Sequence, residues 1–204
     1  MRDYIDAGKL DKPAQVLELK ETSPGVWEWA PVRRAWASIT FQPKANLFSK
    51  VGIGARDAAV VVRRQSLTLH DALSWDGHHL FLTSIVPMGR NHMEVDTAVV
   101  ETTTCRAQGY TTTVGEGNRP QKHEKPPVTF PGVLTEKYVR YETEDTYAMA
   151  RRGLVLVTPK PIRLSEGDLV TVQDGPAAAI YNVKACHVLD PFKNEYEIEY
   201  SRDV

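Results

Sequence analysis

The stretch "VVVRRQSLTL", residues 60–69, has a counterpart later in the chain, and this pair is the strongest indication of the fold. Three aliphatic residues are followed by four others and then by Leu-Thr-Leu; the counterpart, "VLVTPKPIRL" at residues 155–164, repeats that spacing with Ile-Arg-Leu. Short runs rich in Val, Ile and Leu that are bounded by turn formers are typical of β-strands. The two stretches therefore predict two versions of one strand–turn–strand unit.

The correspondence continues along the chain in the same order. Asp76-Gly77 before an apolar pair corresponds to Asp174-Gly175 before another, and residues 93–96 correspond to residues 196–199. The offset between the copies is 95 residues at first and grows afterwards, so small insertions are expected in the turns. An ordered series of matches indicates an internal repeat.

We therefore expect a mainly β protein with two small β-barrel or β-sandwich domains of similar topology. Residues 106–127 are rich in Gly, Pro and Thr, and predict a linker or long loop between a first domain at 1–105 and a second at 128–204. One or two short helices are expected, at residues 3–10 and 43–52. Strand-like sequence occupies 26–41, 58–69, 79–86, 92–101, 137–142, 153–164, 168–173, 178–185 and 194–200.

Composition excludes several classes of protein. The chain has 204 residues, 42% of them hydrophobic and 25% charged, with a net charge of -1, so it is not a polyanion binder as a whole. No apolar run approaches the roughly 18 residues of a membrane span, and the N-terminus lacks a secretory signal. Cys105 and Cys186 are expected to be free thiols in a reducing cytoplasm. Charge is uneven, because residues 31–64 carry seven basic side chains and one acid while the C-terminal part is acidic.

The paired histidines in "SWDGHHLFLTSI", residues 74–85, raise the question of a metal or catalytic site. Asp-Gly between two strand patterns predicts a hairpin turn, and the adjacent His78 and His79 would then point to opposite faces of a strand. The second copy has Pro176 and Ala177 there. No zinc-ligand spacing, phosphate loop or nucleophile motif is present, so we expect no metal, no cofactor and no enzymatic activity.

Residues 27–101 resemble the phage head-tail joining family, which comprises head-closure and head-tail adaptor proteins. The resemblance rests on an aromatic-Ala-Ser-Ile motif at residues 36–39, a variable loop, a strand ending in Arg63 and Arg64, and an Asp/Gly turn. A final hairpin follows, in which a strand with Phe81 leads to one that alternates Glu94 and Asp96. Family members are usually a single domain of about half this length, so the second copy is a departure.

The resemblance implies a structural virion protein with a small β-barrel core and without enzymatic activity, made in the bacterial cytoplasm and located in the phage neck. It would form a homo-oligomeric ring between the portal or an adaptor and the tail proteins, with packaged DNA passing through its channel. The variable loop supplies a candidate docking element, which comprises Lys44, Asn46, Leu47, Phe48, Lys50, Gly52, Gly54 and Arg56. Candidate residues for lining the DNA channel or for contacts between subunits are Arg33, Arg34, Arg63 and Arg64.

Three alternatives remain. A tail terminator or tail-side adaptor would have the same architecture. A small β-barrel nucleic-acid-binding module would need exposed aromatic side chains among the basic ones, whereas the alternation of Trp27, Trp29 and Trp36 favours burial. An enzyme built on Cys186 and His187 would need a thiol with a depressed pKa.

Overall fold

The computed structural model describes residues 9–41, 56–114, 119–137, 153–174 and 177–203. It contains two compact units: unit 1 is Met1–Lys20 with Glu28–Thr102, and unit 2 is Glu21–Trp27 with Thr103–Val204. The regular elements in these ranges are β-strands, and none is an α-helix, which agrees with the predicted mainly β class. No helix among them is long and apolar enough to cross a membrane. The helices predicted at 3–10 and 43–52 lie outside the described residues, apart from Lys9 and Leu10.

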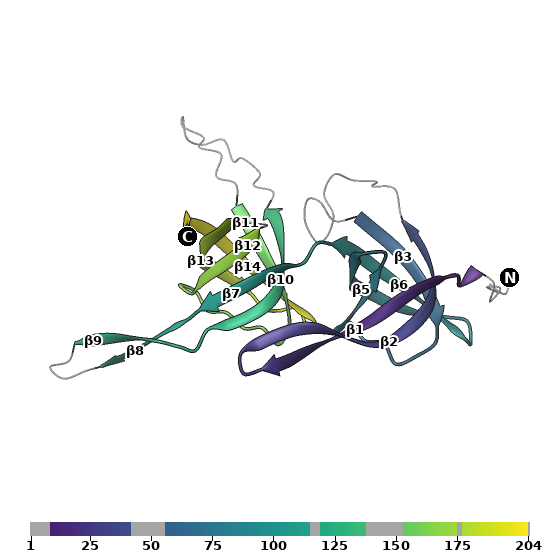
Figure 1. The fold of residues 1–204 in the computed structure, drawn as a ribbon, viewed down its shortest axis with the longest axis horizontal. Coiled ribbons are helices and arrows are strands. Elements are labelled where there is room, and N and C mark those ends of the chain that lie inside the picture. Colours follow the sequence, from purple (N-terminus) through teal and green to yellow (C-terminus); the bar gives the residue numbers. More distant parts are fainter. Residues whose placement is uncertain (1–8, 42–55, 115–118, 138–152, 175–176, 204) are drawn as a thin grey trace, which may run out of the picture. The chain divides into compact units, whose positions relative to one another are not determined.

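Unit 1 is a closed six-stranded antiparallel β-barrel (Figure 1). The strands pair in the order β1-β4-β5-β6-β3-β2, and a pairing between β2 and β1 closes the ring. Their bounds are β1 Lys12–Ser23, β2 Val26–Phe41, β3 Arg56–Arg63, β4 Asp71–Trp75, β5 His78–Met88 and β6 His92–Val100.

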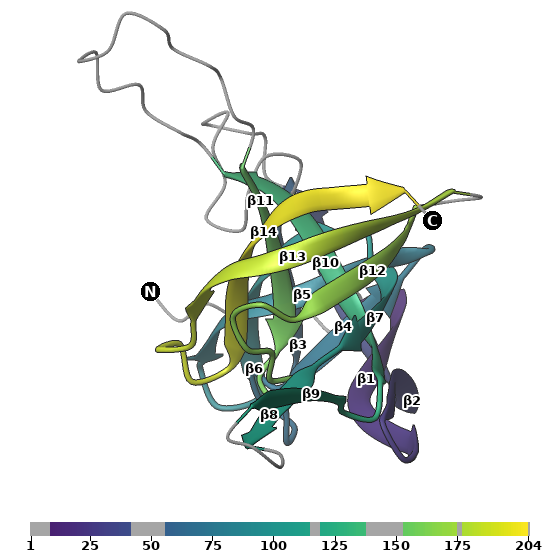
Figure 2. The same ribbon diagram turned by 90° about the vertical axis from the view of Figure 1, so that its left-hand side faces the viewer.

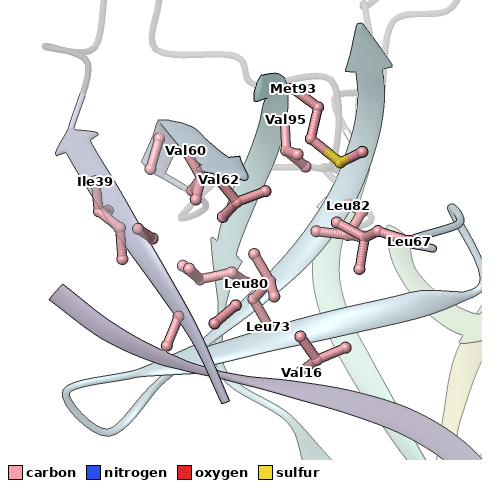
Figure 3. Packing of buried hydrophobic residues seen from close by; sticks show 14 residues of the cluster. Val16, Ile39, Val60, Val62, Leu67, Leu73, Leu80, Leu82, Met93 and Val95 are labelled. Atoms are coloured by element: carbon pink, nitrogen blue, oxygen red, sulfur yellow. The ribbon is translucent and has the colours of Figure 1, made fainter. Parts of the chain in front are cut away.

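Alternation of small or apolar residues with polar ones explains how these strands close around a core. On β3, Ala58, Val60 and Val62 are buried while Arg56 and Arg63 are exposed. A barrel of six strands has an interior just wide enough for side chains to fill. The aliphatic side chains converge on its centre in Figure 3, and those fully buried include Val16, Val60, Val62, Leu73, Leu80 and Val95.

Unit 2 contains a second set of six strands that pair in the order β10-β11-β14-β13-β12-β7, with β7 pairing back to β10. Figure 2 shows β14, β13 and β12 side by side, as this order requires. Its largest fully buried side chains are Tyr196, Phe130 and Leu156. The bounds are β7 Thr103–Gln108, β10 Val128–Lys137, β11 Gly153–Pro159, β12 Leu169–Asp174, β13 Ala177–His187 and β14 Lys193–Asp203.

The two sets share one strand order. Written from β1 and from β7, the orders are β1-β4-β5-β6-β3-β2 and β7-β12-β13-β14-β11-β10, so each strand of unit 1 has a counterpart in unit 2. An irregularity in register interrupts β5–β6 between Leu82 and Ser84, and another interrupts β13–β14 between Val183 and Ala185. The strands joined by the sequence repeat, β3 with β11 and β6 with β14, are indeed counterparts.

The register of the repeat differs from the sequence-based alignment. The Arg64 N–H donates to the Asn91 carbonyl at 2.8 Å, and the Lys160 N–H donates to the Phe192 carbonyl at 3.1 Å. These equivalent bonds give offsets of 96 residues on β3/β11 and 101 on β6/β14, instead of the expected 95 and 103. The predicted offset on β3/β11 is therefore wrong by one residue, a shift that exchanges the two faces of a strand.

The hairpin turn predicted at Asp76-Gly77 is confirmed. Trp75 pairs with His78, so the turn has two residues, and both have positive φ, 51° for Asp76 and 76° for Gly77. Such turns match the twist of the flanking strands and favour Asp-Gly. In unit 2, Asp174 instead ends β12 and pairs with Ala177, so it is not the equivalent of Asp76 within its turn.

Most of residues 106–127, predicted as a linker or long loop, lies in strands. Cys105 and Ala107 are buried, and β7, which contains them, pairs with both β10 and β12, so this strand belongs to the six-stranded set of unit 2. A two-stranded ribbon follows, formed by β8 (Tyr110–Val114) and β9 (Pro120–Glu124), and Figure 1 shows it extending away from β7 and β10. Thr-rich and polar strands carry little hydrophobic signal, so composition alone resembled that of a loop.

Asp71 is the first residue of β4 and Asp168 directly precedes β12, and replacing either should lower stability by a similar amount. The Asp71 carboxylate accepts the Thr68 N–H at 2.7 Å, and the Asp168 carboxylate accepts the Ser165 N–H at 2.8 Å. We expect Asp71→Ala and Asp168→Ala each to lower the free energy of unfolding by about 1–2 kcal/mol in urea denaturation. Exposed Asp57 provides the control, and its replacement should change stability by less than about 0.5 kcal/mol. Equal midpoints for all three variants would contradict the shared role.

Candidate functional site

The candidate site lies on the outer surface of unit 1, where β2 and β3 run side by side. Ala35 and Ala37 of β2 are buried, so the alternating residues Arg34 and Trp36 point outward. Trp36 is 55% exposed, which is unusual for so large an apolar side chain. The burial expected for Trp36 from sequence is therefore wrong, because its neighbours Ala35 and Ala37 occupy the inward positions.

Two further arginines meet this part of β2 from the adjacent strand. The register that pairs Ala37 with Val62 places Trp36 opposite Arg63, whose side chain also faces outward. Arg64 follows, and the bond from its backbone N–H to the Asn91 carbonyl holds its position. Together they border an open hollow of about 450 Å³, lined by Leu10, Arg34, Ala35, Trp36, Arg63, Arg64 and Gln65.

The arginines at the hollow have no counter-charge among the described residues. Among the described residues, no side chain makes a hydrogen bond or ion pair with Arg34, Arg63 or Arg64, and no acidic residue lines the hollow. Glu94, on the neighbouring strand β6, pairs in register with Val61 and lies outside the lining. Clustered like charges without counter-charges destabilise a folded protein, so this arrangement favours an anionic ligand.

Arg33, the fourth basic residue predicted from sequence, has a different role. Its Nε donates to the Gln65 Oε1 at 2.9 Å, and its guanidinium also donates to the Ser66 carbonyl. These bonds hold the connection between β3 and β4 and orient Gln65, which lines the hollow. The structure thus brings three of the four arginines to one place and uses the fourth to support it.

Unit 2 lacks these residues at the corresponding positions. Its register places Thr129 and Pro131 where Arg34 and Trp36 lie, and Pro159 where Arg63 lies. The counterpart of Arg64 is Lys160, but its ammonium group donates to the carbonyls of Val188 and Asp190 at 2.7 and 2.6 Å. The strand order common to both units therefore does not require the basic and aromatic residues of unit 1.

The predicted docking loop is mostly outside the described residues. Of its residues only Arg56 is described; it is the first residue of β3 and is exposed, at the opposite end of that strand from Arg63. The members outside the described residues are Lys44, Asn46, Leu47, Phe48, Lys50, Gly52 and Gly54.

The paired histidines do not come together. His78 is exposed and His79 is partly buried, as expected for neighbours on a strand. The His79 ring lies 5.3 Å from the ring of Trp29, and its Nε2 is buried without a hydrogen-bond partner. Burial lowers the pKa of His79 to about 4, so the ring is neutral at physiological pH. In the described part of the chain, no three His, Cys, Asp or Glu side chains are placed to hold a metal ion.

The two cysteines are unpaired in the structure. Burial raises the pKa of the Cys105 thiol to about 12. The pKa of Cys186 is also raised, by burial and by the charges of Glu166 and Asp168. His187 bonds Glu197 at 2.9 Å. The thiol with a depressed pKa that an enzyme built on Cys186 and His187 would need is therefore not found.

Two glutamates of the acidic strand β14 have lysine partners within unit 2. Glu195 pairs with Lys193 at 2.8 Å and Glu199 with Lys184 at 3.1 Å. Glu197 lies 2.9 Å from His187, a contact that is an ion pair only when the histidine is protonated. Glu195 and Glu199 are therefore a weak complement for the arginines of another subunit.

No protein-family model, no curated protein and no solved structure matches this chain.

Arg33 and Arg34 are adjacent in sequence and should respond differently to replacement. Arg33→Ala removes two hydrogen bonds to the β3–β4 connection, and we expect the free energy of unfolding to fall by about 1–2 kcal/mol in urea denaturation. Arg34→Ala removes a charge that is repelled by Arg63, so stability should stay equal or rise slightly. A large loss of stability in Arg34→Ala would show that this side chain supports the fold.

The buried His79 predicts a loss of stability in acid. The folded chain holds its pKa at about 4, below the ordinary 6.5, so the unfolded state binds more protons between these values. The free energy of unfolding should fall, by at most about 3 kcal/mol, as the pH is lowered from about 6.5 to about 4. His79→Gln should flatten this part of the stability–pH profile, whereas His78→Gln should leave it unchanged. Identical profiles for both variants would refute the role of His79.

Proposed function

We propose that the chain is a structural protein that forms a ring in the neck of a tailed bacteriophage. It would join the portal side of the head to the tail and help to close the head around packaged DNA. The observation that carries this proposal is the small closed β-barrel of unit 1, because residues 27–101 resemble the head-tail joining family and that family is built on such a barrel. The proposal places the protein in the virion, after synthesis in the bacterial cytoplasm.

The exposed ribbon of unit 2 supports a role in assembly. Every residue of β9 and all of β8 except the half-buried Tyr110 are exposed, and Val114 is 72% exposed. A two-stranded ribbon is at best marginally stable alone in water. Its outer edges carry backbone donors and acceptors that an adjacent subunit or ring can pair by adding a strand. The ribbon therefore suits a contact between molecules.

We further infer that the two units are two barrel domains of similar topology that arose as copies. They share a strand order, an irregularity at equivalent places on β5 and β13, and equivalent hydrogen bonds at Asp71 and Asp168. A homo-oligomeric ring of such chains would contain twice as many barrels as subunits. A tail terminator or tail-side adaptor would use the same architecture and is the alternative within this class.

A second candidate function is a small β-barrel nucleic-acid-binding module. One specific observation favours it: Trp36 is exposed and lies among Arg34, Arg63 and Arg64. Aromatic side chains interleaved with basic ones are typical of surfaces that bind single-stranded nucleic acid.

The mass of the intact chain in solution tests the proposed ring. Alone and then mixed with portal rings from the same source, the protein should join the portal in multiple copies, as measured by light scattering or native mass spectrometry. A ribbon-deletion variant provides the matched comparison. The Lys125 N–H donates to the Gly109 carbonyl at 2.9 Å, so a two-residue Asn-Gly turn can replace residues 110–124. This variant should fold but join the portal weakly.

A chain that stays monomeric beside portal rings would contradict the neck proposal. If that monomer also retards DNA in gels, and does so less as salt is raised, the nucleic-acid-binding module takes its place.

A further inference from the structure

We propose that the hollow on unit 1 binds single-stranded nucleic acid, with a base stacked on Trp36 and phosphates held by Arg34, Arg63 and Arg64. This inference rests on the second candidate function, the nucleic-acid-binding module, and deepens it by naming single strands as the ligand and assigning the residues that hold them; it does not rest on the proposed ring. The site consists of two outward residues of β2, one of β3 and the two that follow β3. Its volume of about 450 Å³ lies in the range of ligand-binding pockets.

The arginines identify the charge of the ligand. Three guanidinium groups border one hollow without a partner among the described residues. Guanidinium groups form paired hydrogen bonds with phosphate and carboxylate groups, and they also stack on flat rings. The ligand is therefore an anion with several charged groups.

Trp36 favours nucleic acid over other anions as the ligand of this site. An indole that is 55% exposed beside Arg63 offers a flat surface that a base can cover, and every base has such a surface. A carboxylate side chain would satisfy the arginines but leave the indole in water. Duplex DNA would present its phosphates but keep its bases stacked inside. Single-stranded nucleic acid satisfies both halves of the site.

Gln65 adds a polar group that this chain itself orients. Its Oε1 accepts the hydrogen bond from Arg33 Nε at 2.9 Å, so its amide N–H groups stay available as donors in the hollow. Arg33 is thus a positioning residue, and Gln65 can donate to a phosphate, a sugar or a base edge.

The comparison between the two units argues that these residues serve binding. Unit 2 has the same strand order with Thr129, Pro131, Pro159 and Lys160 in their places. Lys160 is bound to the carbonyls of Val188 and Asp190. The arginines and Trp36 are therefore not needed to form the fold.

Binding of a fluorescent 12-nucleotide deoxythymidine oligomer to the intact chain, measured by anisotropy at several salt concentrations, tests the site. With three phosphates neutralised, the logarithm of the association constant should fall with the logarithm of salt concentration with a slope of about -2. Each of Arg34→Ala, Arg63→Ala and Arg64→Ala should reduce the slope by about 0.7. Arg106→Ala, which removes an exposed arginine of β7 in unit 2, is the control and should change neither affinity nor slope.

Variants of Trp36 distinguish stacking from charge. Trp36→Leu should weaken binding about five- to one-hundred-fold while leaving the salt slope unchanged. Trp36→Phe keeps an aromatic surface and should retain most of the affinity. The two variants should have similar thermal midpoints, because residue 36 lies outside the core. A lowered midpoint would identify a variant whose weak binding comes from loss of folding.

Each of three results, and a fourth given below, would overturn the proposal. The three are absence of binding at low salt, equal affinity in Trp36→Leu and the parent chain, and competition by polyglutamate as strong as that of the oligomer at equal charge. The last would identify an acidic protein segment as the occupant. Tighter binding of duplex than of single strands would also count against stacking. An oligouridine of the same length separates RNA from DNA, and binding of either supports the site.

Discussion

Closure of a six-stranded ring is the constraint on which the rest of unit 1 depends. Once β2 pairs with β1 the barrel has an inside and an outside, and each strand must place alternate residues in a space that one layer of side chains fills. The inward positions of β2 are taken by Ala35, Ala37 and Ile39. Arg34 and Trp36 must then point to solvent, so the same alternation that packs the core also builds the outer surface.

The connection that leads from the third to the fourth strand is held in a different way in each unit. In unit 2, the carbonyl of Ile162 is buried and accepts hydrogen bonds from Asn194 Nδ2 at 2.7 Å and from the Tyr196 hydroxyl at 3.0 Å. The corresponding inward positions of unit 1 are Met93 and Val95, which cannot donate. Arg33 supplies the bonds from outside the core instead. Because Arg33 bonds the side chain of Gln65 in the β3–β4 connection, it also holds Gln65 at the hollow.

Sequence predicted the mainly β class, the Asp76-Gly77 hairpin and the correspondence of β3 with β11 and of β6 with β14, because these depend on local pattern. The second strand expected in each repeat, at residues 67–69 and 162–164, is wrong, because β3 ends at Arg63 and β11 at Pro159 and these residues belong to the connections that follow. Sequence missed β1, β7, β8, β9 and β10. The few buried residues of β1 and β7 are spaced among polar ones, and β8 and β9 are almost entirely exposed. The pairing of β7 with β10 and β12 joins segments that are distant in sequence, so local pattern does not reveal it. Sequence also misplaced the repeat by one residue on β3. Three consecutive valines give no indication of which of them points inward. The register is fixed by long-range pairing, including the bond between the Arg64 N–H and the Asn91 carbonyl.

Only part of the candidate site could be predicted from the sequence, because the rest depends on which face of a strand points into the barrel. The four arginines could be identified as a basic group, but Arg33 and Arg34 are adjacent and only the closed ring shows that one supports a connection while the other faces solvent. The predicted orientation of Trp36 was wrong because it assumed that aromatic residues fill the core. The deciding signal was the small size of Ala35 and Ala37 on either side of it. A strand that alternates alanine with arginine and tryptophan puts its small residues inside a narrow barrel, and its large ones then face solvent.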